Sequence, residues 1–567
     1  MVSERDSGAE NPVAATGLAE LTGPAADLAE LTGPAAGLAE PTGPAAGPAE
    51  PSPGRRPGDW LVVAVPAAVS LVVGGYEIGG PSLWRDEAYT KDAIGRSVSQ
   101  IFTLLGHTDA VHGAYYLLMH VIAAAAGTSA TALRFPSLCA MVIATAFTAA
   151  TGRRAAALAQ GPGTTGRAGN QVAALTGLLS GLVFATAPYM TYYAQTARSY
   201  AIVTMFATIS SYLLLRAYPD GRWRWWAAYA AAVALTGLFN LFGLLILVAH
   251  GVTLLLTDPR GRSGNGRRVG RVPLRWLAAS AAALLVLSPL LRLSFREQKQ
   301  IAWVSRPDAS TIERLFSNFA GSTALILPVA LLALGGVAAA CIADNWRPLN
   351  PAAIALPWLT VPPFLLIAGS YVKPVYVERY VEFCLPALAI LVAAGLVGLT
   401  RAMAGMPLSR LRPTWAPSAL VGLVLAILLI GPQQAIRQSA ARPDNLRLAS
   451  AIVAANEQPG DVVFYLPVDM HVIGTGYPAP FGKLRDIALA RSPIASGTLA
   501  GNEITSPAEL KSRFTDVSRV WVVTGSSNYK FPVPSTPVDK EKMALLAGMH
   551  IIGRWMAGEV MLTLYGR

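Results

Sequence analysis

Charged residues and cysteines are both scarce in this sequence, and each scarcity excludes a class of protein. Only 14% of the 567 residues are charged and 53% are hydrophobic, whereas a soluble globular domain has about 25% charged residues. The three cysteines form no Cys-X-X-Cys pair, and the six histidines show no metal-ligand spacing. We therefore expect neither a single large soluble core, nor a disulfide framework, nor a thiolate metal site.

The sequence instead contains many long apolar runs. Eleven segments, most of roughly 17–20 residues, are apolar enough to cross a bilayer as helices. The sequence thus predicts an α-helical polytopic membrane protein with about eleven transmembrane helices. The predicted spans cover about residues 60–79, 134–151, 172–190, 200–215, 226–240, 241–257, 276–293, 322–342, 351–371, 381–399 and 416–433.

Two apolar stretches need a separate interpretation. Residues 115–126 form too short a helix, since its length of about 18 Å does not span a hydrocarbon core of about 30 Å. We expect this segment to lie on the outer membrane surface as an interfacial helix. The stretch 226–257 is too long for one helix, so we expect a hairpin with its apex near Asn240.

Arginine sets the expected orientation in a plasma membrane. The formal net charge is +12, and arginines concentrate in alternate loops, as the positive-inside tendency predicts. Arg55 and Arg56 precede the first span and place the N-terminus in the cytoplasm. An odd number of spans then places the C-terminus outside. No basic run is interleaved with aromatic residues beyond the cytoplasmic loops, so nucleic-acid binding is not expected.

The two ends of the chain differ from the membrane domain, residues 58–435. Within residues 1–57, a ten-residue unit rich in alanine, glycine and proline repeats from Gly17 onward. Such a tail buries too little apolar surface to offset the entropy of ordering, so we expect a disordered cytoplasmic segment. Residues 440–567 show a helical pattern at Leu446–Asn456 and then strand-like runs. They predict a small extracytoplasmic α/β domain with a mixed sheet.

The first outer loop, residues 80–133, contains most of the unusual polar residues. It opens with the run W-R-D-E-A, which includes Asp86 and Glu87, directly after the first span. A carboxylate at the membrane interface can act as a general base toward an acceptor hydroxyl. The same residues also suit a helix start, with Asp86 as the cap and Glu87 in the first turn. Taken alone, the residues favour the interpretation of Asp86 as a helix cap over that of a general base, because helix caps are common.

Two arginines stand at outer ends of spans, where the positive-inside tendency disfavours them. Arg198 lies in a Q-x-A-R-S-Y segment just before Tyr200, and Arg379 lies in an E-R-Y segment at the tenth span. A guanidinium group can bind a phosphate through two parallel hydrogen bonds. Alternatively, Arg198 reaches lipid headgroups and Arg379 pairs with Glu378. The residues alone leave these alternatives open.

These segments, taken in order, resemble a known family over about residues 60–433. The W-R-D-E-A run, the YYLLMH helix and the Q-x-A-R-S-Y and E-R-Y segments are similar to those of polyprenyl-phosphate-sugar-dependent glycosyltransferases of the GT-C class. The resemblance is greatest to family 39, which includes protein O-mannosyltransferases, the lipid A aminoarabinose transferase and related actinobacterial enzymes. It implies that Asp86 is the catalytic base with Glu87 beside it, and that Arg198 and Arg379 lie near the carrier phosphate.

The predicted function is therefore an inverting sugar transfer on the outer face of the membrane. The donor would be a polyprenyl-phosphate sugar, with a mannose-type hexose favoured, and the acceptor a hydroxyl of a cell-envelope glycan, glycolipid or protein. The activated carrier supplies the energy, and no nucleotide-binding glycine loop is present. Besides Asp86 and Glu87, the candidate site comprises substrate-binding residues, namely Arg85, Asp109, His112, Arg198, Tyr200 and Arg379.

Two questions stay open at the level of the sequence. The aminoarabinose-transferase branch uses further acidic ligands for a divalent metal, and only Asp109 offers a substitute here. A rival function from another class is a polytopic transporter or flippase of lipid-linked glycans. A transporter would show internal repeats and charges at mid-membrane, whereas the charges here gather at the outer interface.

Overall fold

The computed structural model describes residues 59–160, 167–257, 272–297, 304–342, 349–404, 416–525 and 536–567. All of them belong to one compact unit, Arg56–Arg567. The expected disordered tail at residues 1–57 and the arginine-rich loop at 260–271 lie outside the described residues.

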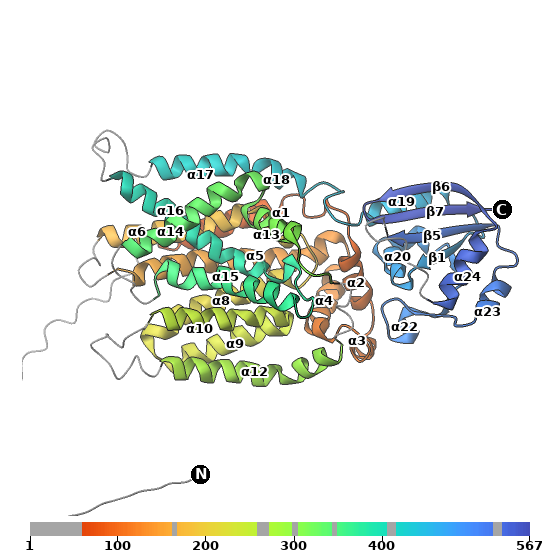
Figure 1. The fold of residues 1–567 in the computed structure, drawn as a ribbon, viewed down its shortest axis with the longest axis horizontal. Helices are drawn as coiled ribbons and strands as arrows, with labels where there is room; N and C mark the ends of the chain where they lie inside the picture. Colours follow the sequence, from red (N-terminus) through yellow and green to blue (C-terminus); the bar gives the residue numbers. More distant parts are fainter. Residues whose placement is uncertain are drawn as a thin grey trace, which may run out of the picture. The chain divides into compact units, whose positions relative to one another are not determined.

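Each predicted span is a helix in the structure (Figure 1). Within the described part of the chain, seven helices are both long and apolar enough to cross a membrane. They are α5 (Ala130–Leu158), α6 (Arg167–Thr186), α8 (Tyr200–Asp220), α12 (Val272–Arg296), α14 (Ile326–Ile342), α15 (Pro351–Ser370) and α16 (Leu385–Ala404). The other predicted spans form shorter helices, which are α1 (Leu61–Gly75), α9 (Trp223–Phe239), α10 (Leu245–Thr257) and α17 (Ala416–Leu428).

The ambiguous stretch 226–257 folds as a hairpin. Helix α9 ends because Asn240 adopts an extended backbone conformation. The Asn240 side chain then accepts the backbone N–H of Phe242 at 2.9 Å and starts the short 3-10 helix η2 (Leu241–Leu244) before α10. The apolar segment at 115–126 forms α4 (Gly113–Ala126), as its composition predicts.

Helix α5 begins earlier than the sequence indicates. Its N-cap is Ser129, whose side chain accepts the backbone N–H of Ala132 at 3.2 Å. The predicted start at residue 134 is therefore late by about one turn. As a result Arg134 lies inside the first two turns of the helix, where its side chain is completely buried.

Short helices at one end of the bundle build the surface that bears the site. Those of the first outer loop are α2 (Arg85–Ile94), α3 (Val98–Leu105), η1 (Ala110–His112) and α4. Later loops add α7 (Pro188–Ala194), α13 (Ala309–Ala320), η5 (Glu378–Tyr380), η6 (Glu382–Cys384) and α18 (Ile430–Ala435). None of the helices α2, α3, α7, α13 and α18 is long enough to cross a bilayer.

The C-terminal region is an α/β domain with a mixed sheet, as the sequence predicts (Figure 1). The strand order is β2-β1-β5-β7-β6, with β1 parallel to β2 and β5, and β7 antiparallel to β5 and β6. All five residues of β1 are buried, as expected of a strand inside a sheet covered on both faces. The strands are β1 (Val462–Leu466), β2 (Arg485–Asp486), β5 (Arg519–Gly525), β6 (His550–Ala557) and β7 (Val560–Gly566), with a small separate pair β3 (Leu489–Arg491) and β4 (Asn502–Glu503). The main helices are α19 (Leu446–Asn456), α23 (Pro507–Arg513) and α24 (Pro537–Leu546).

Three arginines, called the linker arginines below, attach the start of this domain to the rest of the protein, and the last of them lies in the first turn of α19. They are five residues apart, and each donates to a backbone carbonyl oxygen near the end of α1 or in the first two outer loops. The bonds are Arg437 Nη2 to Val73 O at 2.7 Å, Arg442 Nη2 to Gln195 O at 2.7 Å, and Arg447 Nη1 to Gly80 O at 3.0 Å.

Candidate active site

Helix α2 presents the acidic pair. Trp84 is its N-cap, in an extended conformation and with no side-chain cap bond. Asp86 and Glu87 lie in the first turn, where the positive end of the helix dipole favours carboxylates. The interpretation of Asp86 as the helix cap is therefore wrong.

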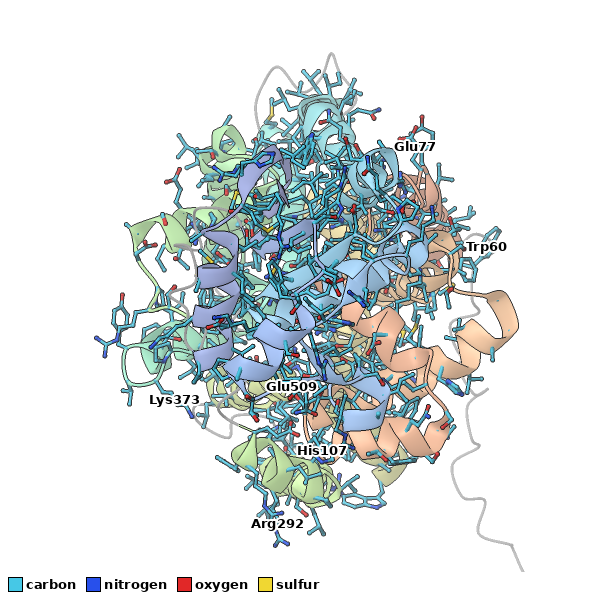
Figure 2. All side chains as sticks on the ribbon, turned by 90° about the vertical axis from the view of Figure 1, so that its right-hand side faces the viewer. Trp60, Glu77, His107, Arg292, Lys373 and Glu509 are labelled. Carbon is cyan, nitrogen blue, oxygen red and sulfur yellow. The ribbon has the colours of Figure 1, made fainter. Side chains whose placement is uncertain are left out.

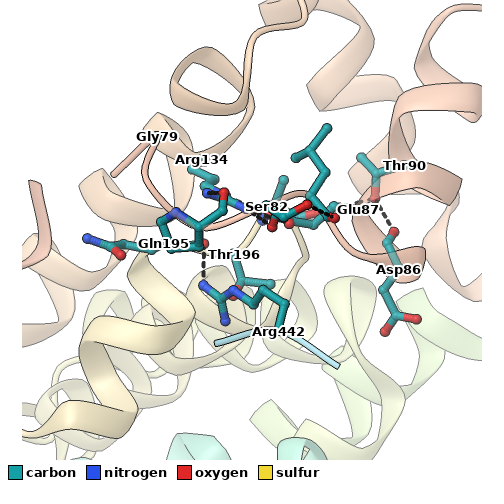
Figure 3. Close-up of polar contacts among 12 residues, drawn as sticks. Gly79, Ser82, Asp86, Glu87, Thr90, Arg134, Gln195, Thr196 and Arg442 are labelled. Carbon is teal, nitrogen blue, oxygen red and sulfur yellow. Dashed lines mark hydrogen bonds and ion pairs between the residues drawn. The ribbon is translucent and has the colours of Figure 1, made fainter. Parts of the chain in front are cut away.

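The two carboxylates point in different directions (Figure 3). Glu87 is fully buried and accepts Arg134 Nε at 2.8 Å, Arg134 Nη2 at 2.7 Å and the backbone N–H of Ala197 at 2.8 Å. Arg134 also donates to three carbonyl oxygens in the segment 78–82. The side chain of Glu87 is therefore enclosed and saturated with donors, which favours a positioning role over the catalytic role predicted from the sequence. It fixes α2 so that Asp86 faces the other way.

Asp86 lines a cavity of about 1200 Å³, called the first cavity below. Of the eight residues predicted for the site, seven line this cavity and Glu87 alone does not. They come from α2, the η1 turn, the start of α8 and η5, so four separate segments converge. The seven are Arg85, Asp86, Asp109, His112, Arg198, Tyr200 and Arg379.

Two guanidinium groups lie beside Asp86. Arg379 Nη2 is 3.8 Å from Asp86 Oδ2, and Arg198 Nη1 donates to the backbone carbonyl of Asp86 at 3.4 Å. Burial alone would lower the pKa of both arginines, but the Asp86 carboxylate and nearby tyrosines raise it above the usual value. Both side chains are therefore fully charged cations in a largely enclosed site.

His112 completes the arrangement around Arg198. Arg198 Nη2 is 3.1 Å from His112 Nε2, and since a guanidinium group only donates, Nε2 accepts. Burial and the Arg198 charge lower the pKa of His112 to about 4. The imidazole is therefore neutral at pH 7 and orients the arginine without adding charge.

Asp109 and Tyr200 also line the first cavity. Asp109 accepts the hydroxyl of Tyr116 at 2.7 Å, and its backbone has a left-handed φ of 60°. Tyr200, at the start of α8, packs edge-to-face on Tyr193 with ring centroids 5.4 Å apart. Lys373 also lines the first cavity, and its exposed side chain lies at the edge of the view in Figure 2.

The C-terminal domain supplies part of the cavity wall, which the sequence did not indicate. Arg85 connects the two parts of the protein, since its backbone N–H and its Nη2 each donate to the Asp444 carboxylate at 3.1 Å. Asp469 and Glu559 line the same wall, and burial raises the pKa of each of these carboxyl groups. Single acidic residues in a soluble domain have no local pattern that would have identified them.

The opposite wall is apolar and comes from the membrane helices. It is built by the end of α9, by η2 and by the end of α12, next to Asn240. Aromatic and leucine side chains form it, namely Phe239, Leu241, Phe242, Leu291 and Phe295. The cavity therefore offers one surface to a lipid chain and another to a polar group.

A metal-binding set is not found in the part of the chain that the structure describes. There, no three histidine, cysteine, aspartate or glutamate side chains are grouped so that they could hold a metal ion. Asp109, the substitute ligand that the sequence offers, is instead engaged with Tyr116.

Part of the chain matches a family model. Residues 167–292 match the model described as dolichyl-phosphate-mannose-protein mannosyltransferase. The matched segment runs from α6 to α12 and includes Arg198 and Tyr200. No curated protein matches the sequence.

Three solved structures are similar to this chain to different extents. ArnT from Cupriavidus metallidurans in the apo state is similar with a TM-score of 0.52 and 14% identity, over 88% of this chain and 97% of that chain. The apo oligosaccharyltransferase from Archaeoglobus fulgidus has a TM-score of 0.47 and 11% identity, over 82% of this chain and 69% of that chain. The arabinosyltransferase EmbB from Mycobacterium smegmatis has a TM-score of 0.39 and 16% identity, over 75% of this chain and 43% of that chain. The likeness to ArnT confirms the predicted fold class, a polytopic helical bundle with a small C-terminal domain.

Proposed function

We propose that this chain is a membrane glycosyltransferase that moves a sugar from a polyprenyl-phosphate donor to an acceptor hydroxyl, with inversion at the anomeric carbon. The sugar is a mannose-type hexose and the acceptor belongs to the cell envelope. The description of the matched family model, a dolichyl-phosphate-mannose-protein mannosyltransferase, supports both the carrier and the sugar. The observation that carries the proposal is the meeting of Asp86 with Arg198 and Arg379 in one cavity.

Asp86 acts as the general base. The acceptor hydroxyl oxygen attacks the anomeric carbon, and its proton passes to the Asp86 carboxylate as the new glycosidic bond forms. The bond from the anomeric carbon to the phosphate oxygen breaks, and its electron pair leaves with the polyprenyl phosphate. A single displacement from the opposite face inverts the anomeric centre.

Arg198 and Arg379 stabilise the departing phosphate. Negative charge on the leaving oxygen grows in the transition state, and fixed cations near it lower the barrier. The 3.8 Å contact between Arg379 and Asp86 is longer than a direct charge-assisted hydrogen bond. The guanidinium group of Arg379 thus lies close enough to Asp86 for the phosphate and the acceptor hydroxyl to meet between them.

The apolar wall of the first cavity receives the carrier chain. Phe239, Phe242 and Leu291 lie at the ends of membrane helices, so an isoprenoid can pass from the bilayer to the arginines along them. The sugar then faces the polar wall that contains Asp469 and Glu559.

In this proposal the catalytic face is extracytoplasmic. The arginine-rich loops mark the cytoplasmic side, and the segment 80–133 and the C-terminal domain lie outside. The protein is then a multi-pass plasma-membrane enzyme with a cytoplasmic N-terminus.

Substitution of Asp86 by asparagine tests the base. Asparagine keeps the size of the side chain but cannot take a proton, so turnover should fall by roughly 10²-fold or more. The measurement is sugar transfer from purified polyprenyl-phosphate mannose in detergent, with folding followed by thermal unfolding.

Asp92→Asn provides the matched control. Asp92 lies on the same helix, pairs with Arg96 at 2.7 Å and lines neither the first cavity nor its neighbour. It should retain transfer activity. Full activity in Asp86→Asn would remove Asp86 from the mechanism.

A further inference from the structure

A second cavity of about 540 Å³ lies beside the first. Its volume falls in the range of about 300–1,000 Å³ that is usual for ligand pockets. The two cavities share three wall residues, Trp84, Arg379 and Pro443. The remaining walls come from α7, α13, η5 and α18. The mechanism above does not use this space.

The second cavity has an aromatic side. Tyr189, Tyr192 and Tyr193 of α7 line it, with ring centroids 4.9 Å and 5.1 Å apart in edge-to-face pairs. These contacts hold the rings in fixed orientations. Fixed aromatic rings offer flat apolar surfaces beside polar hydroxyls, which suit a ligand that is itself amphipathic.

A few polar groups face that aromatic side. Asn318 and Arg314 of α13 and Glu378 of η5 line the cavity, and Arg314 Nε donates to Glu378 Oε1 at 2.9 Å. An amide, a guanidinium group and a carboxylate together both donate and accept hydrogen bonds. This mixture fits a ligand rich in hydroxyl groups, since a hydroxyl also does both.

Trp84 supplies an independent indication of a ligand. Its side chain is buried, with 7% exposure, and among the described residues its indole Nε1 has no hydrogen-bond partner. A buried donor without an acceptor is unfavourable, and native proteins leave few of them. Because Trp84 lines both cavities, a ligand oxygen at their junction would satisfy it.

We propose that the second cavity is the acceptor site and that its occupant is a sugar unit of a glycan. The inference rests on the proposed function. The carrier chain already has its apolar wall in the first cavity, so the second cavity is open to the other substrate. A hydroxyl that passes Trp84 and Arg379 reaches Asp86, which is two residues from Trp84 and 3.8 Å from Arg379.

Filling the second cavity alone tests the proposal. Asn318 lines only that cavity, so Asn318→Trp should block it and leave the first cavity unchanged. The probe acceptor is octyl mannoside, with radiolabelled polyprenyl-phosphate mannose as donor and the full-length protein in detergent. We expect the KM for octyl mannoside to rise about tenfold or more, corresponding to at least about 1.4 kcal/mol. The KM for the donor and the slow release of mannose to water should change less than about twofold.

Phe316→Trp is the matched control. Phe316 lies on the same helix with 54% exposure and lines neither cavity, so its replacement should leave both KM values unchanged. Trp84→Phe is a second test that adds no bulk. It keeps an aromatic ring but removes the indole N–H together with part of the ring, and should raise the acceptor KM about fivefold.

The outcomes separate this inference from the proposed function. Unchanged acceptor KM in both Asn318→Trp and Trp84→Phe would overturn the acceptor site. A rise in donor KM instead would identify the second cavity as a carrier site. Transfer by the wild-type protein to a threonine-containing peptide, and none to octyl mannoside, would refute a glycan occupant. Failure of the wild-type protein to use any polyprenyl-phosphate sugar would refute the proposed function itself.

Discussion

Glu87 and Arg134 form an ion pair with no exposed side-chain surface. Removing either partner of such a pair strongly destabilises the folded protein. Glu87→Gln leaves the Arg134 charge buried without its counter-ion, which should lower the free energy of unfolding by about 3–5 kcal/mol. Thermal unfolding of the purified protein in detergent measures the loss. The double variant Glu87→Gln, Arg134→Met removes the unpaired charge and should regain part of the stability. A stable but inactive Glu87→Gln would return Glu87 to the catalytic machinery.

The sequence could identify this pair of carboxylates but could not distinguish their roles. Asp86 and Glu87 are neighbours at the same interface, and their side chains point about 100° apart around a helix. Which one reaches the cavity depends on the position of Arg134, which is 47 residues from Glu87 along the chain. Arg198 and Arg379 were easier to identify, because the positive-inside tendency makes an arginine unusual at the outer end of a span.

His112 gives the site a pH dependence. Its folded-state pKa of about 4 lies below the value of about 6.5 expected for an unfolded histidine. The unfolded chain therefore binds the proton first, and stability is lost as the pH falls from about 6.5 toward 4. Protonation also sets a second cation against Arg198.

Thermal unfolding of the wild-type protein and of His112→Gln across pH 4–7 measures this effect. The unfolding temperature of the wild-type protein should fall more steeply than that of the variant as the pH is lowered, because glutamine keeps an acceptor but does not titrate. Parallel curves for the two proteins would show that His112 is not buried as a neutral ring.

At the scale of elements, the linker arginines join parts of the chain that the sequence separates widely. Arg442 is buried, stacks on the Tyr192 ring with its guanidinium carbon 3.7 Å from the centroid, and donates to Gln195 O. Arg442→Ala should lower stability by about 2–3 kcal/mol through lost packing and unpaired carbonyl groups. It should also make the linker near Pro443 easier to cleave. Limited proteolysis followed by mass spectrometry locates the cut.

Arg447→Ala is the comparison for this element. Its bonds to Gly79 and Gly80 are exposed, so water can replace them. Equal effects of the two substitutions would contradict the special role of Arg442.

The membrane helices and the central strands were largely predictable from the sequence, and the edge strands were not. All eleven apolar runs form helices, because the bilayer admits few other structures for such segments. The strands β1, β5 and β7 also follow their apolar patterns. The edge strands β2 and β6 have weak sequence patterns, since they are short or largely exposed.

At the scale of the whole molecule, the proposed orientation can be tested directly. A reporter enzyme fused after Pro443 should be active only outside the membrane, and one inserted at 260–271 only inside. Opposite results would place Asp86 on the cytoplasmic face and remove the outward-facing mechanism. Protease protection of the C-terminal domain in sealed vesicles provides an independent reading.

The whole-molecule feature that the sequence concealed is the wall that the C-terminal domain gives to the first cavity. Asp444, Asp469 and Glu559 are scattered along a soluble segment, and only the fold brings them opposite Asp86. The α/β domain was predictable as a unit, but its contact with α2 depends on single long-range pairs such as Arg85 with Asp444.

That shared wall bears on how the protein matures. Synthesis runs from the N-terminus, so the loop with Asp86 emerges early, whereas Asp469 and Glu559 are translated near the end. In the proposed orientation, a nascent chain that has been translated past Arg379 already exposes its base and both arginines, but the cavity lacks the wall that the C-terminal domain supplies. Donor lipids that diffuse past would find no closed site to occupy. Export of the final domain would then switch on the chemistry, and premature hydrolysis of costly lipid-linked sugar by nascent chains would be avoided.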